Sequence, residues 1–169
     1  MSETLDPARL AEQSAILEGE LAAESLERIV VVSPGARMPV GYRLAFSRRR
    51  DGPTVIDLSV RTCLPLRCER CLGPIEWSVE SRSLLAVCFG DDQTRELPDT
   101  LEPVVTDESG RLSLKALVED EILMALPLAP RHAGACGASL REHDPEMVAA
   151  ASREDSPFAA LAALKSSKN

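Results

Sequence analysis

The chain has 169 residues and a formal net charge of −8; 44% of its residues are hydrophobic, but only 3% are aromatic. This length fits one domain, and the composition predicts an aliphatic core. No run approaches the roughly 20 apolar residues that cross a bilayer, and the N-terminus lacks the basic and apolar regions of a signal peptide. Five cysteines without an export signal indicate a cytoplasmic protein with reduced thiols.

The charges are unevenly distributed along the chain. Between Arg37 and Arg82 there are nine arginines against five acidic residues, and between Phe89 and Glu121 there are ten acidic residues against three basic ones. The first stretch suits contact with phosphate and the second suits contact with a basic protein. Two solvated surfaces are the simpler interpretation of both stretches.

The N-terminal elements are predicted to be short. Asp6 and Pro7 have the residue types of an N-cap and a first helical position, and the helix they begin can reach about Ser14. A short strand is predicted over residues 15–21, followed by one or two helical turns. Residues 30–32 are β-branched valines and favour a strand before the sequence SPG ends it.

The clearest pattern is a set of three strands with a period of two, and the first two are joined by the turn sequence Asp51-Gly52. The predicted core face consists of Val40, Tyr42, Leu44, Phe46, Ile56, Leu58, Val60, Leu64, Ile75, Trp77, Val79, Leu85, Val87 and Phe89. Cys63 and Cys88 fall on the opposite face. The pattern predicts an antiparallel β-meander or partly closed sheet whose apolar face must be covered.

The sequence LSLKALVEDEILMAL predicts one long amphipathic helix that covers this sheet and ends at Pro127. Glu121 lies inside its apolar stripe. Burying a carboxylate without a partner costs several kcal/mol, so Glu121 is predicted to pair with Arg67 or Arg70. The alternative role, a catalytic acid, lacks a second titratable group at useful spacing.

The fold class predicted from these elements is α+β, with short helices at both ends of the chain. The predicted organisation is a single domain over residues 1–139, a flexible linker over 140–155, and a short helix and tail over 156–169. A helix this short is not stable alone in water, so it is expected to bind its own domain or a partner. Its predicted contact residues are Phe158, Leu161 and Leu164.

The thiol pair Cys68 and Cys71 has the spacing of a zinc knuckle and is followed by Gly73. The predicted metal ligands are Cys68, Cys71, His132 and Cys136, a Cys₃His set that suits structural zinc. His143 is an alternative fourth ligand, and thiols that only pack or stay reduced are the alternative to a metal site. A redox pair is disfavoured, because the glycine and proline after Cys71 prevent the helix that such motifs lead.

Neither a nucleophilic hydrolase motif nor a phosphate-cradling glycine loop is present in the sequence, so no enzymatic activity and no small-molecule substrate are expected. Two binding functions remain. One is RNA binding through the predicted contact residues Arg48, Arg49, Arg50, Arg61, Arg67 and Arg70. The other is an acidic protein-binding adaptor or chaperone with a structural zinc site and no direct RNA contact.

Several segments resemble the YceD family, whose members are described as large ribosomal RNA subunit accumulation proteins. They are the sequences CERCLGP, VEDEILMALPLAPRH and SPFAALAALK, together with the early DPARLA. Some family members carry a second C-x-x-C after the helix, where this chain has only His132 and Cys136. The resemblance implies a non-enzymatic factor in large-subunit assembly whose partner is large-subunit rRNA or a basic ribosomal protein, without membrane contact.

Overall fold

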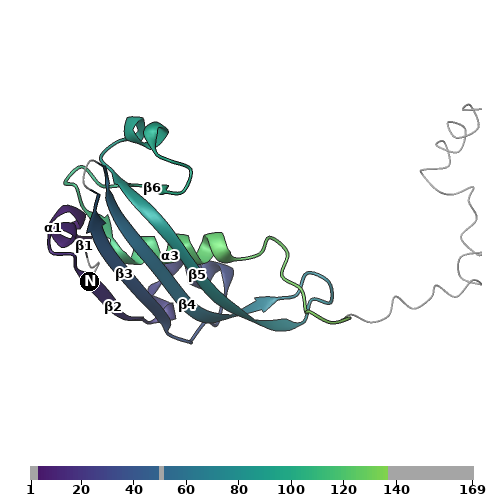
Figure 1. Cartoon of the computed structure of the whole chain (residues 1–169). Helices are drawn as coiled ribbons and strands as arrows, with labels where there is room; N and C mark the ends of the chain where they lie inside the picture. The colour runs from purple at the N-terminus through teal and green to yellow at the C-terminus, as the bar shows by residue number, and fades with distance from the viewer. Residues whose placement is uncertain (1–3, 50–51, 137–169) are drawn as a thin grey trace, which may run out of the picture. The chain divides into compact units, whose positions relative to one another are not determined.

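The computed structural model describes residues 4–49 and 52–136, and Figure 1 shows the order of the elements. The strands are β1 (Thr4–Leu5), β2 (Ile16–Leu21), β3 (Val40–Arg48), β4 (Thr54–Arg67), β5 (Pro74–Cys88), β6 (Glu102–Val105) and β7 (Leu112–Ser113). The helices are α1 (Pro7–Glu12), η1 (Ala23–Ser25), α2 (Glu27–Val32), η2 (Asp91–Glu96) and α3 (Leu114–Ala125). The fold is α+β. None of the described helices is long and apolar enough to span a bilayer.

The main sheet has the order β2-β3-β4-β5-β6, and only the β5–β6 pair is parallel. The predicted meander corresponds to β3, β4 and β5. As far as the chain is described, the sheet is open and not partly closed, because β2 and β6 each pair with a single neighbour and stand at opposite edges. A separate two-stranded sheet joins β1 to β7, just before α3.

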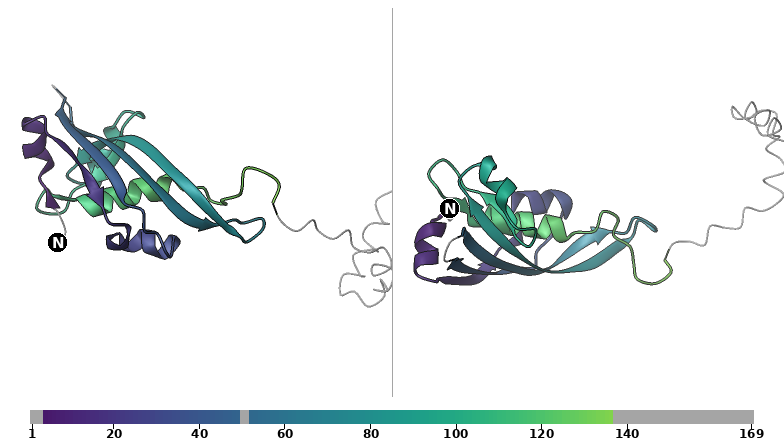
Figure 2. Two further views of the ribbon diagram at one scale, coloured as in Figure 1. Left: turned by 90° about the horizontal axis from the view of Figure 1, so that it is seen from below. Right: turned by 45° about the horizontal axis from the view of Figure 1, so that its top comes forward.

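The apolar face of the sheet is covered by three α-helices and not by one alone. α3 packs against β5 and β4, while α1 and α2 bury Ala11 and Ile29 in the same core. The right-hand view of Figure 2 shows α2 and α3 on the same side of the sheet. Residues 30–32, predicted to favour a strand, lie in α2, where Val31 is 77% exposed. The helix forms here because it buries Leu26 and Ile29 in the core, and this burial outweighs the local β propensity of the valines.

The period-two pattern places most of the predicted core side chains correctly. Phe89 is an exception, because it lies one residue beyond the end of β5 and is 63% exposed. Cys88 is on the opposite face, yet it is only 1% exposed. The same face holds a second apolar cluster formed by Val55, Ala86 and Leu101. That end of the sheet is therefore covered on both sides.

The sequence signals at the helix starts are also correct. Asp6 is the N-cap of α1 and accepts a hydrogen bond from the Arg9 backbone N–H, and Pro7 is the first helical residue. Ser113 is the N-cap of α3, where its hydroxyl accepts from the Ala116 N–H. These caps fix the first residues of α1 and α3.

β4 and β5 extend beyond the other strands as a two-stranded arm. β3 pairs with β4 only up to Arg61, whereas β4 and β5 remain paired from there to Arg67 and Pro74. In Figure 1 the arm projects past the neighbouring strands, and the chain after α3 runs toward its tip. The arm therefore places the Cys68–Cys71 turn outside the main sheet.

One cross-strand ion pair on the open face of the sheet gives a pH prediction. Hydrogen bonds from Arg82 lower the pKa of Asp57 below its ordinary value. The Asp57 carboxylate therefore stabilises the fold above the pKa of about 3.9 of an unfolded aspartate, and the contribution is lost as the pH falls through the lowered folded pKa. In urea denaturation, the free energy of unfolding of the native chain should exceed that of Asp57→Asn at pH 7, and the gap should close in acid. A gap that does not change with pH contradicts this account.

Candidate metal centre

The tip of the β4–β5 arm is a tight turn that gathers polar groups. The Cys68 N–H donates to the Gly73 carbonyl at 2.9 Å, and the Leu72 N–H donates to the Cys68 carbonyl at 2.8 Å. Leu72 has a φ of 62°, the left-handed region that costs a non-glycine residue about 1–2 kcal/mol. The sequence suggested that Gly73 would serve the turn, but the left-handed residue is one position earlier. Contacts around the tip must therefore hold Leu72 in this conformation.

The segment that follows α3 supplies such contacts. The Glu69 N–H donates to the Pro130 carbonyl at 2.8 Å, and Arg70 Nη2 donates to the His132 carbonyl at 3.1 Å. These bonds join the arm tip to residues 130–132, which come about sixty positions later in the chain. The imidazole of His132 is thereby brought beside the thiols.

Four side chains form the cluster that the sequence predicted. Cys68, Cys71, His132 and Cys136 each offer one ligand atom, and these atoms all lie within 4.8 Å of one another. The Cys68 side chain is fully buried and the other three residues are partly buried. The Cys₃His cluster could therefore hold a metal ion. The alternative ligand His143 lies outside the described residues.

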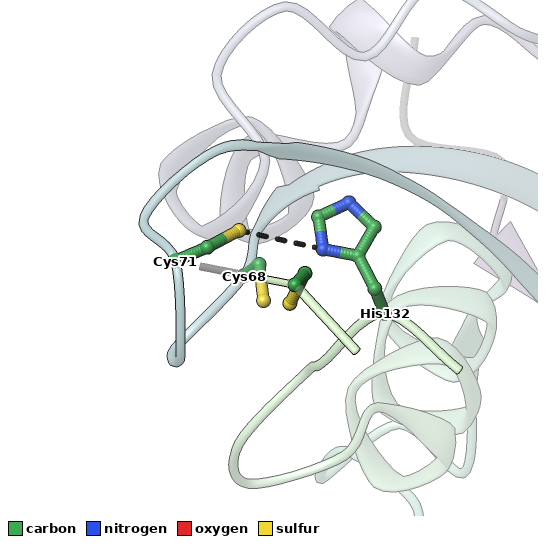
Figure 3. Close-up of side chains that lie close together, drawn as sticks. Cys68, Cys71 and His132 are labelled. Atoms are coloured by element: carbon green, nitrogen blue, oxygen red, sulfur yellow. Dashed lines mark hydrogen bonds between the residues drawn. The ribbon is translucent and has the colours of Figure 1, made fainter. Parts of the chain in front are cut away.

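The His132 ring is oriented as a metal ligand should be. Its Nε2 is 3.0 Å from the Pro74 carbonyl, which can only accept, so this nitrogen carries the proton. In the neutral ring Nδ1 is then the lone-pair nitrogen, and it faces the Cys71 Sγ at 3.4 Å (Figure 3). A backbone carbonyl that fixes the tautomer of a histidine is the usual outer support of a metal site.

The dimensions also suit zinc. Tetrahedral bonds of about 2.3 Å to sulfur and 2.0 Å to nitrogen place neighbouring ligand atoms about 3.5–3.8 Å apart. The distance of 3.4 Å between Cys71 Sγ and His132 Nδ1 is close to this value, and the limit of 4.8 Å needs only small movements of the other side chains. Three thiols with one imidazole form a soft donor set, which favours zinc over hard cations such as magnesium.

Cys63 and Cys88 lie apart from this cluster, and their surroundings keep them protonated. Loss of hydration, with the Glu76 carboxylate 3.3 Å from its sulfur, raises the pKa of Cys63. Burial raises the pKa of Cys88. Both are therefore thiols at neutral pH, and Cys63 provides a matched control for substitutions in the cluster.

Glu121 is buried as predicted, but its predicted partners are wrong. The hydroxyls of Ser81 and Ser83, which are on β5, each donate to one oxygen of the Glu121 carboxylate. Arg67 and Arg70 instead bind the backbone carbonyls of Leu72 and His132. The sequence did contain the signal, because Ser81 and Ser83 have the core-facing parity of β5.

The predicted RNA-binding arginines are spread along the whole length of β4. Arg48 pairs in register with Thr54 at the first residue of β4, and Arg67 is its last residue. At about 3.3 Å per residue these two ends are about 40 Å apart. Arg61 is exposed and lies between these two ends of β4, and Arg49 is exposed and follows the last residue of β3. Arg50 lies outside the described residues.

Acidic residues also accompany the arginines of the sheet. Arg43 Nε is 2.8 Å from Glu18, and Arg82 pairs with Asp57 at 2.6 Å. Arg48 is 3.9 Å from Glu12. Carboxylates on β2, α1 and β4 therefore neutralise part of the positive charge of these arginines. The face of the sheet opposite the core carries both positive and negative charges.

The fold and the cluster define a small α+β protein with a thiol-rich site at the end of a β-arm. The chain belongs to the YceD family, because the family model described as Large ribosomal RNA subunit accumulation protein YceD matches residues 56–165. The chain is also similar to the Large ribosomal RNA subunit accumulation protein YceD of Haemophilus influenzae, with 31% identity over 167 residues, 96% of this chain and 94% of that protein. No solved structure matches the chain. The family membership expected from the motifs is confirmed.

Proposed function

We propose that the protein is a non-enzymatic factor that supports accumulation of the large ribosomal subunit RNA by holding a component of the assembling subunit. Membership of the YceD family carries this proposal. The site itself agrees with a binding role. The thiols and the imidazole face one another, and the buried carboxylate of Glu121 is satisfied by two serine hydroxyls. The cluster and the Glu121 contact hold parts of the fold together, which suits a protein that presents a fixed binding surface.

We assign zinc to the cluster, with Cys68, Cys71, His132 and Cys136 as ligands. A bound zinc supplies a cross-link between the arm tip and the segment after α3. Within the chain, the Pro74 carbonyl orients His132, and the Pro130 carbonyl holds the Glu69 end of the turn. The role of the metal is structural, since four protein ligands complete a tetrahedral site.

The partner is either large-subunit RNA or a basic ribosomal protein. The predicted contact arginines are spread along β4, and Arg43, Arg48 and Arg82 of the same sheet each lie beside a carboxylate, so one broad RNA platform is not favoured. The ten acidic residues between positions 89 and 121 favour a basic protein partner. RNA contact is the second candidate, with Arg67 and Arg70 at the arm tip, Arg48 and Arg61 on β3 and β4, and Arg49 just after β3 as its contact residues. Arg50, the sixth predicted contact residue, lies outside the described residues.

The proposed function is tested in cells that lack the protein. The ratio of large- to small-subunit RNA should fall in these cells, and the native chain should restore it. Cys71→Ser should restore it poorly, whereas Cys63→Ser should restore it fully at the same protein level. An unchanged RNA ratio in the deletion strain contradicts the proposal.

The RNA candidate has a separate test in the salt dependence of binding. If Arg49 and Arg61 each contact a phosphate, Arg49→Glu combined with Arg61→Glu should reduce the slope of log affinity against log salt by about 0.7–0.9 per contact. Arg9→Glu, an exposed arginine on α1, is the control and should not change the slope. Fluorescence anisotropy with a labelled large-subunit RNA fragment measures this, and equal slopes in all variants would exclude contact through these arginines.

A further inference from the structure

The open edge of the main sheet at β6 is suited to pairing with another strand. Among the described strands β6 pairs only with β5, and Glu102, Pro103 and Val105 are exposed. The Thr106 N–H donates to the Cys88 carbonyl of β5. Because successive residues of a strand direct their backbone groups to alternate sides, the backbone groups of Val105 and Pro103 face the open edge. Pro103, which lacks a backbone N–H, therefore breaks no hydrogen bond to β5. The N–H of Val105 points to the open edge and can donate to an added strand.

Beside this edge, a groove runs between β6 and α3. It consists of two adjoining hollows of about 430 and 280 Å³ that share Val104, Leu117 and Asp120. Leu58 and Leu85 of the core line the larger hollow. Met124 of α3 stands at its border and is 83% exposed. The groove therefore offers apolar surface that no other described segment covers.

The border of the groove is acidic. Glu102 of β6 and Asp120 of α3 line the larger hollow, and Asp107 lines the smaller one. Arg28 binds Asp120 at 2.6 Å, and Arg111 lines the smaller hollow, so the two arginines offset part of the charge. No ion pair within the described residues involves Glu102, which leaves its carboxylate available. The surface as a whole favours a cationic ligand.

We propose that this groove binds an extended, basic segment of a partner protein, which pairs with β6 as a sixth strand of the sheet. Alternate side chains of an added strand point to one face, so apolar residues of the segment would enter the groove. Its lysine or arginine residues would lie beside Glu102 and Asp120. This inference rests on the proposed function in one respect: that the partner protein is a component of the ribosome.

Charge complementarity selects this occupant over others. RNA would bring phosphates next to three carboxylates, which is unfavourable. A second copy of this chain, with its own net charge of −8, would bring a second acidic border to the first. A basic segment satisfies the open N–H of Val105, the apolar floor and the carboxylate of Glu102 together.

The test uses the full chain and a fluorescein-labelled peptide of about ten residues in which lysine and valine alternate. Fluorescence anisotropy should show saturable binding of this peptide and none of the matched glutamate–valine peptide. Val105→Pro should weaken binding at least tenfold by removing the outward N–H, and Met124→Glu, which places a charge over the apolar floor, should do the same. Glu80→Lys, on the exposed part of β5 away from the groove, should cause less than a twofold change.

Amide chemical shifts locate the bound peptide and decide the remaining outcomes. Shifts confined to β6 and α3 support the proposal. Shifts elsewhere, or equal binding by Val105→Pro and the native chain with unchanged melting temperatures, overturn it. A tenfold gain in peptide affinity after deletion of residues 137–169 would also overturn it, by making the chain's own C-terminus the occupant. Because the measurement needs no ribosomal component, its failure would leave the RNA-accumulation function intact.

Discussion

Replacing Cys71 by serine is expected to abolish zinc binding and to lower the melting temperature by about 10 °C. A metal present at about a thousand times its dissociation constant stabilises the folded state by about 4 kcal/mol, and for a chain of this size each kcal/mol corresponds to about 2–4 °C. Serine keeps the shape of the side chain but is a poor zinc ligand, so the loss reflects the missing sulfur. Metal analysis of the purified protein and calorimetry measure the two effects.

The control for this substitution is Cys63→Ser. Cys63 is on β4 of the same arm, but its thiol faces Glu76 on the opposite side of the sheet from the core. It should keep about one zinc per chain and a native melting temperature. A chelator should lower the melting temperature of the native chain to that of Cys71→Ser. Equal zinc content in Cys71→Ser and the native chain would remove the metal assignment.

Replacing Glu121 by alanine is expected to lower the free energy of unfolding by about 2–4 kcal/mol. The substitution leaves two half-buried hydroxyls without an acceptor, removes hydrogen bonds to a charged group, and opens a small cavity below α3. Urea denaturation measures the change. Met124→Ala on the same helix is the control, and its exposed position should limit the effect to about 0.5 kcal/mol.

A second variant separates the polar contact from the packing. Glu121→Leu together with Ser81→Ala and Ser83→Ala replaces the whole polar group by apolar side chains. Because neither of these half-buried hydroxyls then remains without a partner, this triple variant should recover most of the stability that Glu121→Ala loses. If it is as unstable as Glu121→Ala, the hydrogen bonds are not the cause of the loss.

The sequence predicts the parts of the fold that depend on interactions between residues close together in the chain. The alternation in β3, β4 and β5 and the apolar stripe of α3 are visible because each element buries one face. The cluster of three thiols and an imidazole is predictable because Cys68 and Cys71 have knuckle spacing and His132 follows the covering helix. The sequence predicts a short strand over residues 102–106, which corresponds to β6. Its parallel pairing with β5 and its place at the sheet edge are not predicted, since four residues carry no period that identifies their neighbour.

The errors concern partners chosen over long distances in the chain. Glu121 was assigned to Arg67 or Arg70 by charge, whereas the register of β5 under α3 presents Ser81 and Ser83. The pair of Arg28 with Glu119 likewise joins α2 to α3 through a buried carboxylate that the pattern of α3 did not single out. The linker 140–155 and the contact residues Phe158, Leu161 and Leu164 lie outside the described residues, so their roles stay predictions.

The arm has a consequence for how the protein opens. Beyond Arg61 the arm has only two strands, and such a ribbon is marginal by itself in water. Its amide protons should therefore exchange with solvent through a local opening that is easier than global unfolding. The hydrogen bond from Arg70 to the His132 carbonyl and the neighbouring cluster close that opening. The rate of amide exchange at the tip would then be limited by the rate at which the metal dissociates. The fraction of molecules in which the arm is open would depend on the zinc concentration in the cell.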